Sequence, residues 1–166
     1  DDGTYQIHMR GFDSKGQERF ATKTVNSKSA GQQYTPSIAM APDGRFVVAW
    51  EDQSDSKDTP QVFIRGFNAD GTEMFHDRNT MDTVSGTRRS PDVAMAPDGT
   101  FVVTWSDDSD GNGIYQIYAK GFNADGTDRI KHFTVNTVDS GQQYSPSVAM
   151  NASGDFYIVY DDNKSV

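Results

Sequence analysis

The sequence predicts an all-β protein built from three similar four-stranded units, and three observations support this fold class. The chain of 166 residues repeats itself every 55 residues without an insertion or deletion. Its candidate strands are short, rich in β-branched and aromatic residues, and bounded by turns that contain glycine. Apolar residues nowhere follow a sustained 3.6-residue period, so we expect almost no helix.

The 55-residue period is visible at glycine, proline, methionine and aromatic positions. Residues that recur at this spacing include Gly11, Gly66 and Gly121; Pro36, Pro91 and Pro146; Met40, Met95 and Met150; and Trp50, Trp105 and Tyr160. The repeats cover approximately 1–55, 56–110 and 111–165. We therefore predict a single repeat domain over 1–166.

The first two strands of each unit form a predicted hairpin, which is clearest in the middle copy. Residues 90–96 form a short, apolar stretch with a proline near its start. Residues 97–99 read Pro-Asp-Gly, a tight turn in which glycine supplies a positive φ. Residues 101–105 are β-branched and aromatic, as a strand should be. The aromatic residue that ends this strand, and the repeated methionine, are expected in the core.

The second hairpin of the unit follows an acidic loop at 106–113. Residues 115–122 alternate as a strand, and Asn-Ala-Asp-Gly at 123–126 turns the chain. A weaker fourth strand is expected at about 129–135. Four antiparallel strands in 55 residues match the size of a β-propeller blade. An immunoglobulin-like sandwich would need about seven strands and offers no reason for the period.

The phase of the repeat predicts two complete blades and one divided blade. The complete blades are expected at about 35–83 and 90–138. The third blade is split, with its inner strands at 145–162 and its outer strands at 5–25. A propeller closes its ring with half a blade from each end of the chain. The fold class is therefore three 55-residue four-stranded propeller-type blades.

A ring of three blades is smaller than the four to eight blades that propellers usually have. The two half-blades would leave strand edges that invite pairing with another chain. Two explanations stay open. Two chains exchange half-blades to close a six-bladed ring with two-fold symmetry, or the chain is a cut from a longer tandem array. The expected partner is therefore a second copy or neighbouring repeats.

Composition excludes several function classes. Asp and Glu number 24 against 15 Lys and Arg, a net charge of -9, so a nucleic-acid partner is not expected. The absence of cysteine excludes a disulfide scaffold and a thiol nucleophile. No apolar run approaches the length of a transmembrane helix, so we expect no membrane insertion. The chain begins without Met or a signal-peptide pattern, which indicates a mature form or an excised piece.

One loop matches the first half of a calcium-binding loop. Residues 108–113 place oxygen ligands at alternate positions with glycine between them, which suits a hard cation. The closing acidic residue would be Ala119, so that part of the motif is missing. The competing interpretation is a solvated turn. The predicted calcium ligands are Asp107, Asp108, Asp110 and Asn112.

The connection before each inner strand is the candidate ligand site. Two copies offer amides and a tyrosine, which suit sugar hydroxyls and sugar rings. The middle copy replaces them with two arginines, which suit a carboxylate or phosphate. The alternative is that these side chains pack on neighbouring blades and pair with carboxylates. The candidate residues are Gln32, Gln33, Tyr34, Arg88, Arg89, Gln142, Gln143 and Tyr144.

Motifs of common enzymes are missing from the sequence. It contains no HExxH, GxSxG, P-loop or nucleotide fingerprint. Its carboxylates lie in turns without apolar neighbours that would raise a pKa for acid catalysis. We therefore expect that the chain is not an enzyme and has no catalytic residue.

The repeat resembles tandem repeats of very large secreted bacterial proteins that also carry RTX-type calcium-binding segments. The resemblance rests on TVNT…GQQYSPSVAM, DGTFVVTWSDDSDGNG and IYQIYAKGFNADGT, and covers all three copies. It implies a non-catalytic, calcium-stabilised module in an adhesin or surface protein. The implied location is extracellular, at the cell surface or in the periplasm. The chain lacks the glycine-rich nonapeptide repeats of RTX proteins proper.

Three functions follow from these observations, and the sequence leaves all three open. The first is a calcium-stabilised structural or adhesion module that self-associates through its half-blades. The second is a lectin-like glycan-binding module that uses the Gln-Gln-Tyr connections. The third is an accessory domain or subunit of a larger enzyme or complex. The fold cannot choose among them, because propellers host binding, scaffolding and catalysis alike.

Overall fold

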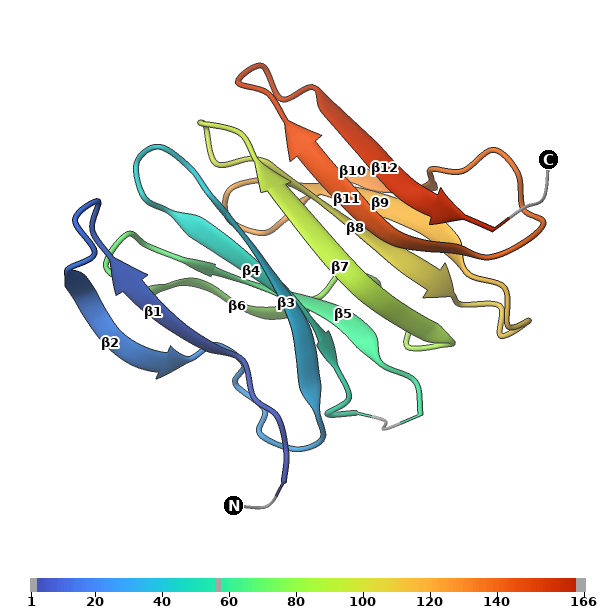
Figure 1. Ribbon diagram of the computed structural model, residues 1–166, viewed down its shortest axis with the longest axis horizontal. Helices are drawn as coiled ribbons and strands as arrows, with labels where there is room; N and C mark the ends of the chain where they lie inside the picture. Colours follow the sequence, from blue (N-terminus) through green and yellow to red (C-terminus); the bar gives the residue numbers. More distant parts are fainter. Residues whose placement is uncertain (1–2, 56–57, 164–166) are drawn as a thin grey trace.

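The computed structural model describes residues 3–55 and 58–163, and within them the chain forms strands and no helix (Figure 1). This confirms the all-β fold class. The strands are β1 (His8–Phe12), β2 (Glu18–Thr24), β3 (Gln33–Met40), β4 (Phe46–Asp52), β5 (Gln61–Phe67), β6 (Glu73–Asn79), β7 (Thr87–Met95), β8 (Phe101–Asp108), β9 (Gln116–Phe122), β10 (Asp128–Thr134), β11 (Gln143–Met150) and β12 (Phe156–Asp162).

The strands form four antiparallel sheets. Strands β3–β6 make one four-stranded sheet, here blade 1, and β7–β10 make the second, blade 2. Two-stranded sheets flank them, the N-terminal half-blade β1–β2 and the C-terminal half-blade β11–β12. The half-blades lie at opposite ends of the molecule (Figure 1). They are separate sheets, so within the described chain they do not join into the single divided blade that the sequence predicted.

Strand β7 brings the blades together at their inner strands. It contacts β3 of blade 1 on one side and β11 of the C-terminal half-blade on the other. The outer strands β6 and β10 are the edge strands of their sheets farthest in order from this line of contact. The first strands of blade 1, blade 2 and the C-terminal half-blade, which are β3, β7 and β11, therefore lie together on the inside.

Repeated Asp-Gly-Thr turns set the hairpin register. Asp125 Oδ1 accepts hydrogen bonds from the hydroxyl of Thr127 at 2.6 Å and from its backbone N–H at 2.9 Å. The hydroxyl bond is the main reason that the pKa of Asp125 lies below its usual value. Gly126 adopts a φ of 79° between them, which a residue with a side chain rarely does. The same arrangement lowers the pKa of Asp70 beside Thr72.

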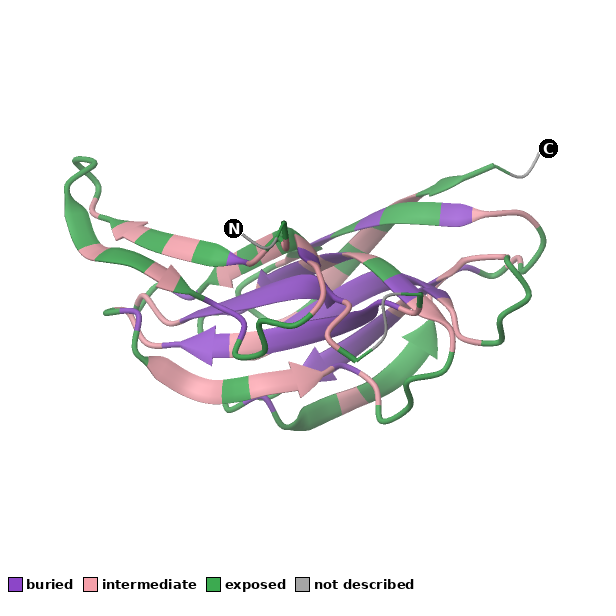
Figure 2. Ribbon diagram, turned by 90° about the horizontal axis from the view of Figure 1, so that it is seen from below, coloured by how far each residue is buried: buried purple, intermediate pink, exposed green. Residues whose placement is uncertain are grey.

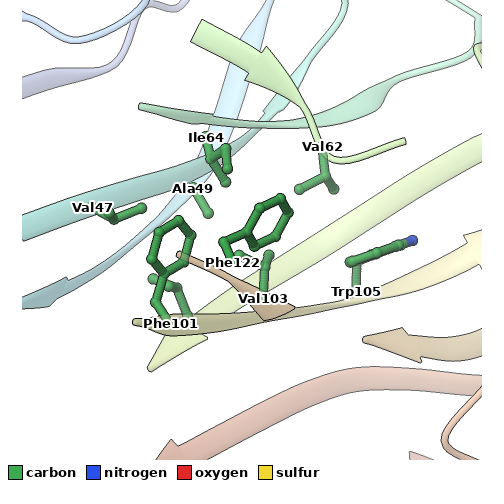
Figure 3. Packing of buried hydrophobic residues seen from close by; sticks show 9 residues of the cluster. Val47, Ala49, Val62, Ile64, Phe101, Val103, Trp105 and Phe122 are labelled. Atoms are coloured by element: carbon green, nitrogen blue, oxygen red, sulfur yellow. The ribbon is translucent and has the colours of Figure 1, made fainter. Parts of the chain in front are cut away.

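The largest cluster of buried apolar residues lies between the two complete blades. Trp50 and Trp105 are fully buried, as expected for this aromatic position, whereas Tyr160, their counterpart in the third copy, is only half-buried. Met40 is 67% exposed, so the expectation that all three repeated methionines pack in the core is wrong. Burial is concentrated in the central sheets and falls off toward both half-blades (Figure 2). The side chains that meet between the blades include Val47, Ala49, Val62, Ile64, Phe101, Val103, Trp105 and Phe122 (Figure 3).

Candidate functional site

The predicted calcium ligand Asp107 belongs to the interior. Its carboxylate accepts hydrogen bonds from Trp105 Nε1 at 2.8 Å and from Arg88 Nε at 2.9 Å. Blade 1 repeats the first of these bonds, from Trp50 Nε1 to Asp52 Oδ2 at 3.0 Å. This position therefore fastens the end of the second strand of the blade, and the other oxygen of Asp107, Oδ1, accepts a hydrogen bond from the backbone N–H of Ser109 at 2.8 Å.

The rest of the predicted calcium loop is closed by its own hydrogen bonds. Asp108 Oδ1 accepts from the backbone of Gly113 at 3.1 Å, and Asp110 Oδ2 accepts from Asn112 Nδ2 at 2.7 Å. Among residues 3–55 and 58–163, no three or more His, Cys, Asp or Glu side chains gather in a way that could hold a metal ion. Calcium at Asp108, Asp110 and Asn112 stays a prediction.

Three predicted ligand residues are buried and serve the fold. Gln33, Arg88 and Gln143 occupy the same repeat position and are at most 1% exposed. Arg88 donates to Asp107 and to the backbone oxygen of Thr83, so its charge is neutralised inside blade 2. In the single chain these three side chains face the interior and not the surface, and ligand binding by them stays a prediction.

Gln32 and Gln142 hold loops in place. Gln32 Oε1 accepts from the backbone N–H of Tyr5 at 2.7 Å. Gln142 Oε1 does the same for Tyr115 at 2.9 Å, and its Nε2 donates to the oxygen of Gly113 at 2.6 Å. These bonds place Tyr5 beside Tyr34 and Tyr115 beside Tyr144.

The third residue of each connection reaches the surface, because Arg89 and Tyr144 are exposed and Tyr34 is half-buried. Tyr144 is 39% exposed, and its ring centroid lies 5.2 Å from that of Tyr115. Tyr34 pairs in the same way with Tyr5 at 6.0 Å, and Tyr5 is 68% exposed. Arg89 is the exposed residue at this position of the middle copy. Two tyrosine pairs and one arginine therefore remain available to a ligand.

Each accessible residue directly precedes a pocket built from three copies of one motif. The pocket measures about 390 Å³ and lies where β3, β7 and β11 approach one another. We call it the Ser-Pro pocket. It is lined by residues 35–37, 90–92 and 145–147.

The backbone of the Ser-Pro pocket is unusual in all three copies. Thr35, Ser90 and Ser145 have φ values of 45°, 53° and 51°, a left-handed conformation that side-chain-bearing residues rarely adopt. The pairing of each inner strand with its neighbour is interrupted at these same residues. Such bulges re-aim side chains, and strain of this kind tends to gather at functional sites.

Two carboxylates organise the hydroxyl groups of the pocket. Asp92 Oδ1 accepts from Ser37 Oγ at 2.6 Å, and Asp92 Oδ2 accepts from Ser147 Oγ at 3.0 Å. The three residues share one repeat position, so a single aspartate links three sheets. The buried Glu51 accepts from the hydroxyl of Thr35 and from the backbone N–H of Ser90, each at 2.8 Å.

Asp92 is not among the residues that the sequence pointed to as site candidates. The sequence does distinguish Asp92, because the other two copies have a serine at the same repeat position. A charged residue that replaces a small polar one at one copy indicates a special role for that copy. Glu51 sits in an acidic run, and nothing in the sequence marks it as the buried member.

No family model matches the sequence, and a search of curated proteins finds no match. The fold is similar to that of an endo-arabinase from Bacteroides thetaiotaomicron, with a TM-score of 0.60 and 16% sequence identity. The similarity covers 99% of this chain and 64% of that chain. The chain thus spans somewhat under two thirds of the length of the enzyme, and the likeness concerns the fold.

This comparison corrects one expectation from the sequence. The absence of enzyme motifs led to the prediction that the chain is not an enzyme. That prediction is contradicted, because the same propeller-like fold is found in an endo-arabinase. The HExxH, GxSxG, P-loop and nucleotide motifs belong to other folds, so their absence from this sequence does not bear on this one. In the described ranges, no helix is long and apolar enough to cross a membrane.

Proposed function

We propose that the face of this chain that carries the Ser-Pro pocket binds carbohydrate. The pocket would take the hydroxyl groups of a sugar, and the tyrosine pairs beside it would stack on sugar rings. The observation that carries the proposal is the pocket itself. It has three copies of a strained Thr/Ser-Pro motif around Asp92, with accessible aromatic residues directly before two of them.

The chemistry of the pocket suits a neutral, hydroxyl-rich ligand. Serine and threonine hydroxyls both donate and accept hydrogen bonds, as sugar hydroxyls do. Asp92 and Glu51 already hold several of these groups in fixed directions, which reduces the entropy that binding would cost. A volume of about 390 Å³ is within the range of small-molecule pockets.

The accessible residues add apolar contact and charge. Tyrosine presents a flat apolar face together with a hydroxyl, which suits a sugar ring. Tyr34 and Tyr144 occur in the outer copies, whereas Arg89 occupies the same position in the middle copy. Its exposed guanidinium would favour sugars that carry a carboxylate. The fold that this chain shares with an endo-arabinase is consistent with a carbohydrate ligand.

The test is binding of arabino-oligosaccharides and uronate-containing oligosaccharides, measured by isothermal titration calorimetry and on a glycan array. The same mixtures are assayed for cleavage, which separates binding from turnover. Tyr144→Ala is expected to weaken binding at least about tenfold, because it removes the stacking surface. Arg89→Ala is expected to weaken binding of the uronate ligands selectively.

Phe133→Ala is the matched control. Phe133 is 38% exposed, like Tyr144, and has one ring neighbour, Phe156 at 6.5 Å. It lies on the outermost strand of blade 2, away from the inner-strand connections. Binding should be unchanged in this variant. The proposal fails if no oligosaccharide binds, or if Tyr144→Ala and Phe133→Ala bind equally well.

A further inference from the structure

The two half-blades correspond, by the repeat, to the outer half and the inner half of a four-stranded blade. In each complete blade the second strand pairs with the third, β4 with β5 and β8 with β9. Strand β12 corresponds by the repeat to β4 and β8, and β1 corresponds to β5 and β9. Each of them has one edge that no described strand covers. The missing partner of each edge is therefore the kind of strand found at the other end of the chain.

The N-terminal half-blade already has the internal arrangement of a complete outer half. Arg10 pairs with Glu18, as Arg65 pairs with Glu73 in blade 1. Arg10 also lies over the ring of Phe12 at 5.3 Å, and Arg65 lies over Phe67 at 5.5 Å. Blade 2 repeats both features with Lys120. The outer half is thus preformed and lacks only its inner strands.

The C-terminal half-blade is a preformed inner half in the same sense. Strand β11 pairs with β12 in the register that β3 uses with β4, including the interruption at the Ser-Pro motif. Met150 faces Phe156 as Met40 faces Phe46. Neither half would need to rearrange its own pairing in order to receive the other.

Apolar residues that a neighbouring sheet or strand covers in one copy are exposed in the copy where that neighbour is missing. Phe12 is 53% exposed, whereas its repeat partners Phe67 and Phe122 are 3% and 1% exposed. Ile38 on the face of blade 1 is 61% exposed, against 5% for Val93 in blade 2. The sequence places the same apolar character at all copies, so the exposure arises from a missing neighbour.

Strand β12 also exposes apolar side chains whose counterparts in blade 1 are buried. Tyr157 and Val159 are 77% and 67% exposed. Their counterparts in blade 1 are Val47 and Ala49, which are fully buried and pack against blade 2. Such a row of exposed apolar side chains along an open edge favours association with another strand.

A hollow of about 710 Å³ lies where the inner strands of a divided blade would sit. It is bounded by the N-terminal half-blade on one side and by blade 1 on the other. Met9, Phe12, Ile38 and Met40 are among its apolar lining residues. The repeat assigns this place to a strand equivalent to β12. The side chains of Tyr157 and Val159 on that strand would point toward Ile38.

We propose that β12 of one copy pairs with β1 of a second copy, so that two chains close one ring of six blades. Each copy supplies two complete blades, and the two composite blades are built from the half-blades of both. Both open edges are used up, and two-fold symmetry makes the two junctions identical. A second copy is the fitting occupant because every chain carries both complementary halves.

The complete blades fix the register of this junction. Phe46 lies opposite Phe67 and Trp50 opposite Phe63. Shifted by the repeat, Phe156 pairs with the partner's Phe12, and Tyr160 pairs with the partner's His8. Stacked phenylalanine rings at 5.1 Å in blade 1 and 5.0 Å in blade 2 would gain a third example at the junction.

Engineered cysteines test the register directly, since the native chain has none. The double variant Tyr160→Cys with His8→Cys should form, under mild oxidation, a covalent species of twice the 18.3 kDa chain mass. The control pair, Tyr160→Cys with Arg10→Cys, is two residues out of register and should stay uncrosslinked. Equal crosslinking of both pairs would overturn the proposed register.

Native mass spectrometry and light scattering test the assembly without crosslinks. The wild-type chain should be a dimer with a melting temperature that rises with protein concentration. Val159→Asp should give a folded monomer, because Val159 is already exposed in the single chain. The control is Val84→Asp, which should leave the dimer intact. Val84 is 61% exposed and lies in the segment between β6 and β7 that joins blade 1 to blade 2.

A wild-type chain that stays monomeric at all concentrations would overturn the proposal. It would do so also if neighbouring repeats of a longer protein supply the missing half-blades. This result is independent of the proposed function. A monomer that binds oligosaccharides would overturn only the dimer, and a dimer that binds none would overturn only the carbohydrate site.

Discussion

Arg88 and Asp107 form a buried ion pair in blade 2, with Nε and Oδ2 separated by 2.9 Å and neither side chain more than 1% exposed. Both outer copies have glutamine where blade 2 has Arg88. Gln143 Nε2 donates to Asp162 Oδ1 at 3.1 Å, so glutamine can serve the same repeat position. The repeat therefore contains its own matched replacement for the arginine.

Arg88→Ala should cost about 3–5 kcal/mol of unfolding free energy, because it leaves a buried carboxylate without its cation. Arg88→Gln should cost less than about 2 kcal/mol, since an amide donor remains for Asp107. Urea unfolding of both variants measures the difference. Equal losses in the two variants would show that the charge, and not the hydrogen bond, is what this position requires.

Gly86→Ala should be markedly more harmful than Gly113→Ala. Both glycines have positive φ, 68° and 80°, so both variants carry the cost of a left-handed residue, about 1–2 kcal/mol. A Cβ at Gly86 would also overlap the backbone of Asp108, whereas a Cβ at Gly113 meets open space. The difference in urea midpoint isolates the close approach of the two backbones. A similar loss in both would contradict that packing.

Acid should destabilise the chain partly through its Asp-Gly-Thr turns. The folded pKa of Asp125 lies below its ordinary value, so its contribution is complete above the unfolded pKa of about 3.9. It is lost as pH falls further, through the folded pKa. Thr127→Val removes the main cause of the shift, so the variant should lose less stability between neutral pH and about pH 3.

The control for this experiment is Thr134→Val, an exposed threonine at the end of β10, the strand that begins directly after Thr127. It should lose as much stability on acidification as the wild-type chain. Thermal melts at both pH values measure the two losses. An acid sensitivity that Thr127→Val leaves unchanged would place the titrating groups elsewhere.

The repeat made the strands predictable, because each one is marked three times. The expected hairpins at 90–105 and 115–135 agree with β7–β10 to within a few residues, and Trp50 and Trp105 are buried as expected. The sequence could not show that Met40 is exposed. Burial depends on the neighbouring sheet, and the repeat says nothing about which copy lacks one.

The candidate site was predictable in part for a different reason. The connections at Tyr34, Arg89 and Tyr144 were identified, but their buried neighbours were grouped with them. Side chains alternate across a strand, so Arg88 and Arg89 point to opposite faces although they are adjacent. The left-handed residues before each proline depend on a bulge, and sequence alone does not place bulges.

The offset between sequence repeat and blade has an evolutionary consequence. Each 55-residue repeat begins with the outer strands of one sheet and ends with the inner strands of the next. Unequal recombination that adds or deletes one repeat would therefore rejoin equivalent strands, and no new junction would have to be invented. Ring size in such a lineage can drift by whole blades, while the pairing rules between blades stay the same.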